Sequence, residues 1–133
     1  MRFLVLLTFT LALQGCYLLD AYLMTKYDPN EYKIITDIRA LASKAKTSCG
    51  DEAVSKTLSE ELNKSTRLFL LYSEYIPRNK ENIQASKSLD EMAHELAERY
   101  AKGKVSVIYC KMKFENLETS AKKIQSAIGS RPR

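Results

Sequence analysis

Three cysteines, Cys16, Cys49 and Cys110, are the side chains of this 133-residue sequence best suited to covalent chemistry. An odd number of cysteines in an exported protein leaves one thiol to be explained. Cys49 and Cys110 could form a disulfide in an oxidising compartment, where closing a loop of about sixty residues would stabilise the fold by ~4 kcal/mol. The alternative is two unrelated buried thiols.

Side chains suited to acid–base or nucleophilic catalysis are few. His94 is the only histidine, and it lies among glutamates, where a solvated surface histidine is the usual case. Ser120 and Lys123 match a serine–lysine spacing, but on an ordinary amphipathic segment. The sequence has no nucleophile-elbow motif, no set of zinc or calcium ligands and no glycine-rich phosphate loop. We therefore predict no enzyme activity, no metal, no cofactor and no small-molecule substrate.

The N-terminus has the layout of an export signal. Arg2 is followed by an apolar run from Phe3 to Leu13 and a small residue before Cys16. The segment Leu13-Gln14-Gly15-Cys16 resembles the lipobox of bacterial lipoproteins. This resemblance implies cleavage between Gly15 and Cys16 and attachment of acyl chains such as palmitate to Cys16.

Two alternatives to a lipoprotein stay open at this end of the chain. An uncleaved anchor could run from Phe3 to Leu19, near the shortest length that spans a bilayer. An ordinary cleaved signal would leave Cys16 as a free thiol. If Cys16 is acylated, the residue that follows it, Tyr17, bears on location. In enteric-type bacteria an Asp there keeps lipoproteins in the inner membrane, so the resemblance implies the outer membrane, with the domain facing the periplasm.

The formal net charge is +5, and the basic excess is concentrated in residues 101–133. Such a stretch can contact nucleic acid, anionic lipid or an acidic protein. An exported protein has little access to nucleic acid, so lipid head groups or a protein partner are the better candidates. The plainer interpretation is a solvated helix face with a frayed tail.

The elements that must position these residues form one small domain. We divide the chain into a signal peptide (1–15), a lipid anchor with a short spacer (16–27), a helical domain (28–129) and a basic tail (130–133). The spacer is apolar and aromatic. We therefore expect it to rest on the membrane interface or to pack on the domain.

Start and stop signals predict four helices. The first begins at Asp28-Pro29-Asn30-Glu31, which has a capping acid, an early proline and a glutamate three residues after the cap, and it ends at Gly50. The second runs from about Asp51 to Ile76. The third begins near 79 or restarts at 88, and it ends at Gly103. The fourth runs through residue 128, although 105–110 is also compatible with a short strand.

Apolar residues at helical spacing give each segment one core-facing stripe. The stripes are Ile34, Ile38, Leu41, Ala42, Ala45 and Cys49; Val54, Leu58, Leu62, Phe69, Tyr72 and Ile76; Ala85, Leu89, Met92, Ala93, Leu96 and Tyr100; and Val107, Cys110, Phe114, Leu117, Ala121, Ile124 and Ile128. Short turns between them favour an all-α, up-down four-helix bundle.

The up-down connectivity of the predicted bundle also predicts where Cys49 and Cys110 lie. Cys49 ends the first helix and Cys110 lies in the first turn of the fourth, so both come to the same end of neighbouring helices. Both also occupy core-facing positions. The bundle therefore favours a Cys49–Cys110 disulfide.

The second half of the second helix is more apolar than one buried face requires. Either this helix is buried on all sides, or part of it forms a patch that accepts a partner helix. The candidate patch residues are Leu68, Phe69, Leu71, Tyr72 and Tyr75.

The lipobox, the small four-helix domain and the Cys49–Cys110 pair together resemble the pilotin lipoproteins of type II secretion systems. Those proteins bind a segment of a secretin and carry it to the outer membrane. The resemblance is one of layout and assigns no pilotin binding residue to this chain. A second resemblance is to lipoproteins of phages and prophages, such as the outer subunits of spanins and proteins that block superinfection.

We therefore expect a lipoprotein that acts as a periplasmic binding or adaptor module at the outer membrane through protein–protein interaction. The alternative is a phage or prophage lipoprotein that acts in superinfection exclusion or host lysis.

Overall fold

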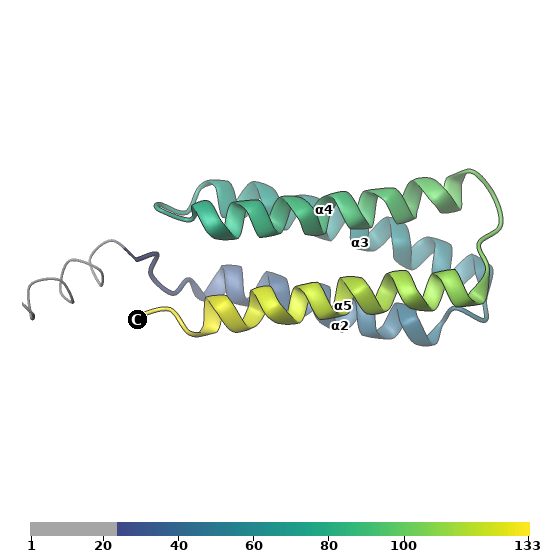
Figure 1. The fold of residues 1–133 in the computed structure, drawn as a ribbon, viewed down its shortest axis with the longest axis horizontal. Helices are drawn as coiled ribbons and strands as arrows, with labels where there is room; N and C mark the ends of the chain where they lie inside the picture. The colour runs from purple at the N-terminus through teal and green to yellow at the C-terminus, as the bar shows by residue number, and fades with distance from the viewer. Residues whose placement is uncertain (1–23) are drawn as a thin grey trace, which may run out of the picture.

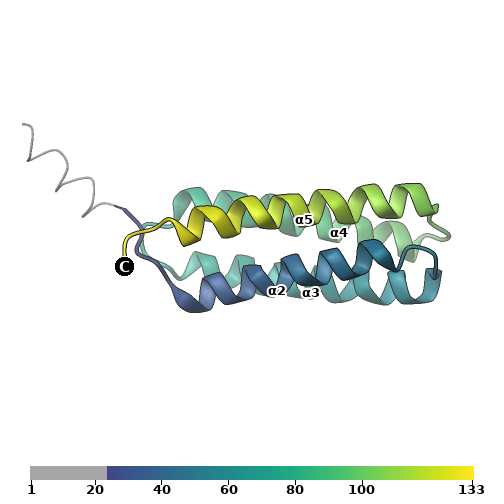
Figure 2. The same cartoon turned by 90° about the horizontal axis from the view of Figure 1, so that it is seen from below.

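The computed structural model describes residues 24–133, which form an all-α, up-down bundle of four helices (Figure 1). The helices are α2 (Pro29–Thr47), α3 (Glu52–Glu74), α4 (Lys80–Ala101) and α5 (Val107–Gly129). Each helix contacts the next along the chain, and α5 closes the bundle against α2. Figures 1 and 2 show the α2–α5 pair lying against the α3–α4 pair. The predicted fold class is confirmed.

Acidic side chains cap the first two described helices. The Asp28 carboxylate accepts the Glu31 N–H at 2.8 Å, and Pro29 lies in the first turn of α2. The Asp51 carboxylate accepts the Val54 N–H at 3.1 Å at the start of α3. Each cap satisfies a backbone donor that has no partner within its helix.

The structure decides the two helix starts that the sequence left open. α4 begins at Lys80 with Asn79 as its N-cap, so it does not restart at residue 88. The Ser106 hydroxyl accepts the Tyr109 N–H at 3.3 Å and begins α5 as a helix where a strand was the alternative. Gly103, just after α4, has φ of +139°, which glycine adopts without the steric cost of a Cβ atom.

The turn between α3 and α4 is tight. α3 ends at Glu74, two residues before the predicted end, because the backbone N–H groups of Tyr75 and Ile76 bond to carbonyls only three residues back. Arg78 follows with φ of +64°, the left-handed region that non-glycine residues rarely adopt.

All four helices contribute to one core. Its largest completely buried apolar side chains are Phe69, Phe114, Ile35, Ile38, Leu62, Leu89, Leu96, Leu117 and Ile128. Full burial of a side chain of this size stabilises a fold by roughly 1.5–3 kcal/mol. Packing along the bundle axis is therefore the main source of stability.

The predicted stripes are wrong in detail. On α2, Ile35 is completely buried although it was left out of the predicted stripe, while Ile34 and Leu41 only pack at the edge of the core. The buried row steps by three and four from Ile35, and a residue one position away lies about 100° around the helix. Val54 and Val107, in the first turns of α3 and α5, are also exposed, at 42% and 46%.

Cys49 and Cys110 form the predicted disulfide, with their Cα atoms 5.8 Å apart. It joins the residues just after α2 to the first turn of α5, and both cysteines are buried. The pairing follows from the up-down connectivity, because antiparallel neighbours bring the end of the first described helix to the start of the last. Cys16, with its predicted cleavage site at Gly15, lies outside the described residues.

We call the end of the bundle where α2 begins and α5 ends the near end, and the disulfide end the far end. At the near end the Thr25 hydroxyl donates to the Arg78 carbonyl at 2.6 Å. The Tyr27 N–H donates to the Pro132 carbonyl at 2.9 Å. The last residues of the predicted spacer therefore lie on the domain. The tail is bonded in place, where a frayed tail was the plainer expectation.

Candidate interaction surface

The five residues predicted to form a partner patch do not share one environment. Leu68, Leu71 and Tyr75 are 58%, 43% and 89% exposed. Phe69 is completely buried in the core, so its place in the patch is wrong, and Tyr72 is half-buried. The helical period explains this division, because residues 68, 71 and 75 lie on one outward face. We call Leu68, Leu71 and Tyr75 the α3 stripe.

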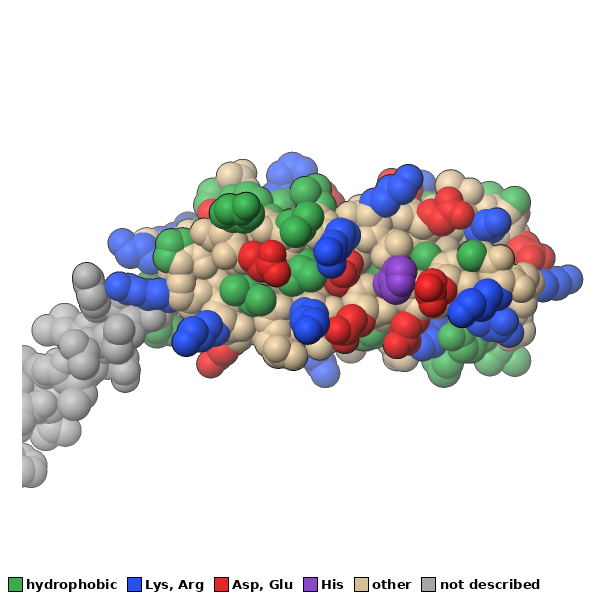
Figure 3. Space-filling view, turned by 90° about the horizontal axis from the view of Figure 1, so that it is seen from above, with side chains coloured by type: hydrophobic (Ala, Val, Ile, Leu, Met, Phe, Trp, Pro, Cys, Tyr) green, Lys and Arg blue, Asp and Glu red, His purple; other side chains and the backbone are tan. Residues whose placement is uncertain are grey.

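An open groove of about 590 Å³ runs beside the α3 stripe, between α3 and α4. Its lining residues are Asn63, Lys64, Arg67, Leu68 and Leu71 of α3 and Asp90, Glu91 and His94 of α4. On this face, hydrophobic side chains gather over the near-end half, and charged side chains of both signs are interspersed (Figure 3).

Asp90 holds the polar part of this groove in place. Its carboxylate accepts the Thr66 hydroxyl at 3.2 Å and lies 3.2 Å from the Arg67 guanidinium. The Asp90 side chain is only 12% exposed, whereas that of Arg67 is 62% exposed. A partner in the groove would thus meet the Arg67 guanidinium, paired with Asp90, beside the apolar stripe.

The residues weighed for catalysis make other contacts. His94 is 60% exposed, and its Nε2 lies 3.6 Å from a Glu98 carboxylate oxygen. The Ser120 hydroxyl donates to the Met92 sulfur at 3.9 Å, and within the described residues no hydrogen bond joins it to Lys123. Neither contact is the hydrogen-bonded pair of nucleophile and base that covalent catalysis uses.

No group of three or more His, Cys, Asp or Glu side chains among residues 24–133 is placed to hold a metal ion. No helix in the same range is long and apolar enough to cross a membrane.

A buried polar cluster at the near end was not predicted. Its centre is Glu31, which is completely buried. One carboxylate oxygen accepts the Ser73 hydroxyl at 3.2 Å, Asn79 Nδ2 at 2.8 Å and the Asn82 amide. The Arg131 guanidinium pairs with the other oxygen and donates to Asn79 Oδ1 at 2.7 Å. We call these five residues the Glu31 cluster.

The place of Glu31 three residues after the Asp28 cap matches a capping box, in which the carboxylate bonds back to the backbone N–H of the cap. The Asp28 cap forms, but the Glu31 carboxylate points into the bundle instead. Charged and amide donors shielded from water bind it more strongly than one solvated backbone N–H would. The sequence signal that could have predicted the Glu31 cluster is the presence of polar residues, such as Ser73 and Asn82, at inward-facing positions.

Lys46 of α2 and Glu118 of α5 form an ion pair at 2.7 Å between the two helices with the most extensive contact. The hydrogen bond from Lys46 is the main cause that lowers the pKa of Glu118. The same bond is the main cause that raises the pKa of Lys46, with a smaller contribution from Glu115. Burial shifts the pKa of each group in the opposite direction and is outweighed.

The α3 stripe thus combines exposed apolar side chains with an adjoining polar groove, a surface suited to an amphipathic helix. Comparisons of the chain with protein-family models, with curated proteins and with solved structures found no match.

Proposed function

We propose that this chain is a bacterial or phage-encoded lipoprotein, anchored by a lipid on Cys16 and directed to the outer membrane. Its helical domain would act there as a periplasmic binding or adaptor module for a protein partner. The observation that carries the proposal is the exposed α3 stripe, since Leu71 and Tyr75 would gain free energy from burial against a partner.

The stripe suggests the kind of partner. Leu68, Leu71 and Tyr75 follow one face of α3 over about 10 Å, which matches two turns of an amphipathic helix laid alongside. The groove beside the stripe places the Arg67–Asp90 pair at its polar edge. A partner helix with an apolar face and an acidic residue near Arg67 would suit both features.

Two observations support the location. The Cys49–Cys110 disulfide is of the kind that persists in oxidising compartments such as the periplasm. The lipobox-like Leu13-Gln14-Gly15-Cys16 supports the lipid anchor and the export route.

The test is capture of the partner by the full chain, purified from membranes in detergent. Leu71→Glu should release the partner because it places a charge in the apolar contact. Val54→Glu is the matched control, since Val54 is a similarly exposed apolar residue near the other end of the same helix. Equal retention by the wild-type chain and by Leu71→Glu would rule out the α3 stripe as the binding surface.

The alternative function is superinfection exclusion or host lysis by a phage or prophage lipoprotein. The observation that favours it is the short segment between the proposed anchor at Cys16 and the domain, because Thr25 and Tyr27 are bonded to the domain and hold it near the anchor. Blocking a receptor at the membrane suits such a domain better than carrying a secretin does. Secretion genes beside this gene would favour the adaptor, and lysis or tail genes would favour the alternative.

A further inference from the structure

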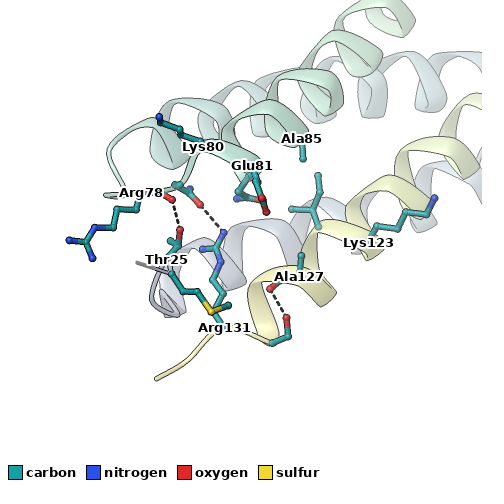
Figure 4. Close-up of a pocket in the computed structure, with 13 residues that line it drawn as sticks. Thr25, Arg78, Lys80, Glu81, Ala85, Lys123, Ala127 and Arg131 are labelled. Atoms are coloured by element: carbon teal, nitrogen blue, oxygen red, sulfur yellow. Dashed lines mark hydrogen bonds between the residues drawn. The ribbon is translucent and has the colours of Figure 1, made fainter. Parts of the chain in front are cut away.

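A second pocket opens at the near end, between the start of α4 and the end of α5, with a volume of about 810 Å³ (Figure 4). Part of its lining is apolar and comes from Met24, Ala85, Ile124 and Ala127. The two helices contact each other less than the other neighbouring pairs do, which leaves this space between them. The pocket therefore offers an apolar interior that opens to solvent.

Basic side chains surround the opening. Arg78, Lys80 and Lys123 are exposed, and Figure 4 shows their charged ends directed outward from the rim. Among the described residues, no carboxylate forms an ion pair with Lys80 or Lys123. Glu81 is the only acidic residue among the described ones that line the pocket. The rim is therefore cationic and points away from the bundle.

The backbone adds to this charge. The Asn79 amide is bound to Glu31, so α4 begins without a side-chain cap. The N-terminus of a helix carries a partial positive charge, and here it lies beside Lys80 at the pocket. Arg133 lies nearby, with its guanidinium 5.3 Å from the centre of the Tyr27 ring.

The place of the basic rim at the near end indicates which surface the rim contacts. Thr25 and Tyr27 are bonded to the near end, so residues 1–23 connect to the domain at this end. Under the proposed function, the lipid on Cys16 is only eight residues before Met24. The near end would then face the bilayer that holds the anchor.

Resting on that proposed anchor, we infer that the near end docks on the surface of an anionic phospholipid bilayer, with Lys80 and Lys123 contacting lipid phosphates at the pocket rim. A basic surface beside a lipid anchor is a common second contact with anionic membranes. Each Lys close to an anionic surface strengthens binding by roughly five-fold. Docking by this end would keep the bundle upright, with Leu68 and Leu71 of the α3 stripe at its side and Tyr75 close to the docked end.

The test uses the full chain in vesicles of phosphatidylcholine alone or mixed with phosphatidylglycerol. Amide hydrogen exchange is measured in the first turn of α4 and in residues 129–133. We expect slower exchange in the anionic vesicles, lost at high salt and in the variant Lys80→Glu/Lys123→Glu.

The matched control is Lys104→Glu/Lys111→Glu, which makes the same charge change with two exposed lysines at the far end. It should leave the slower exchange intact. An equal effect of the far-end variant, or equal exchange in both kinds of vesicle, would overturn the inference. Slower exchange on adding inorganic phosphate to the phosphatidylcholine vesicles would overturn it too, because the rim would then bind free phosphate.

Sedimentation with vesicles reports on the anchor, and charge-dependent hydrogen exchange reports on the docking surface. A chain that sediments with both kinds of vesicle but shows no charge-dependent exchange keeps the proposed anchor and loses the docking surface. A chain that sediments only with anionic vesicles, with slower exchange, loses the anchor and keeps the docking surface.

Discussion

Arg131 pairs with Glu31 across 100 positions of sequence and so fastens the C-terminal tail to the first turn of α2. The Glu31 side chain is completely buried and that of Arg131 is 11% exposed. The pair lies at the near end, where it also orders Asn79 at the start of α4. Three helices and the tail thus share one charged contact.

Arg131→Met should lower the free energy of unfolding by about 3–5 kcal/mol, because it leaves the buried Glu31 carboxylate without its counter-charge. Denaturant unfolding with the disulfide intact measures this change. The double variant Glu31→Gln/Arg131→Met should recover part of the loss. Arg99→Met removes an exposed arginine and should change stability by less than about 0.5 kcal/mol. A similar effect of both arginine variants would contradict a structural role for the pair.

Reduction of the Cys49–Cys110 disulfide should destabilise the bundle by about 4 kcal/mol, because the unfolded chain regains the freedom of a long loop. Thermal unfolding with and without reductant measures the loss. A thiol count under denaturing, non-reducing conditions should find neither cysteine reactive. Two reactive thiols from Cys49 and Cys110 would refute the disulfide.

The Lys46–Glu118 pair should make stability depend on pH at the acid end. Because the folded pKa of Glu118 is lowered, its contribution is present above the ordinary pKa of 4.5 and is lost as pH falls through the folded value. In Lys46→Met the Glu118 pKa should rise toward that ordinary value, as measured by NMR titration of its carboxyl group. Lys33→Met breaks an exposed pair with Asp37 and is the control. An unchanged Glu118 pKa in Lys46→Met would disprove this coupling.

The same pair predicts the opposite behaviour at the alkaline end. The folded pKa of Lys46 is raised, so its contribution is present below the ordinary value of 10.5 and is lost as pH rises through the folded value. Glu118→Gln should therefore bring the Lys46 pKa down toward 10.5, measured by titration of the lysine side chain.

Phe69 and Leu71, two residues apart on α3, should respond very differently to substitution. Phe69→Ala should cost about 3–5 kcal/mol, because it leaves a cavity in the core. Leu71→Glu should change the free energy of unfolding by less than about 0.5 kcal/mol, since this side chain is exposed. Urea unfolding distinguishes them, and a large loss in Leu71→Glu would show that the α3 stripe supports the fold.

Much of the fold could be predicted because its causes are local. Asp28 and Asp51 cap the helices that follow them within three residues, and Gly103 lies just after the helix it ends. Helical spacing of apolar residues then defined four faces that could only be buried against one another. Short turns predicted an up-down connectivity, and that connectivity placed Cys49 next to Cys110.

The tertiary structure alone decided which side chains of an apolar run face outward and where the buried charge goes. Phe69 lies on the core-facing stripe and Leu71 does not, yet both were candidates for the patch. The positions of α2 and α4 around α3 bury Phe69 and leave Leu71 exposed. The backbone N–H of the Asp28 cap is a plausible local partner for Glu31. In the folded chain, however, the Glu31 carboxylate pairs with Arg131, close to the C-terminus. Local spacing sets a helix and its faces, whereas burial depends on neighbours that only the assembled bundle supplies.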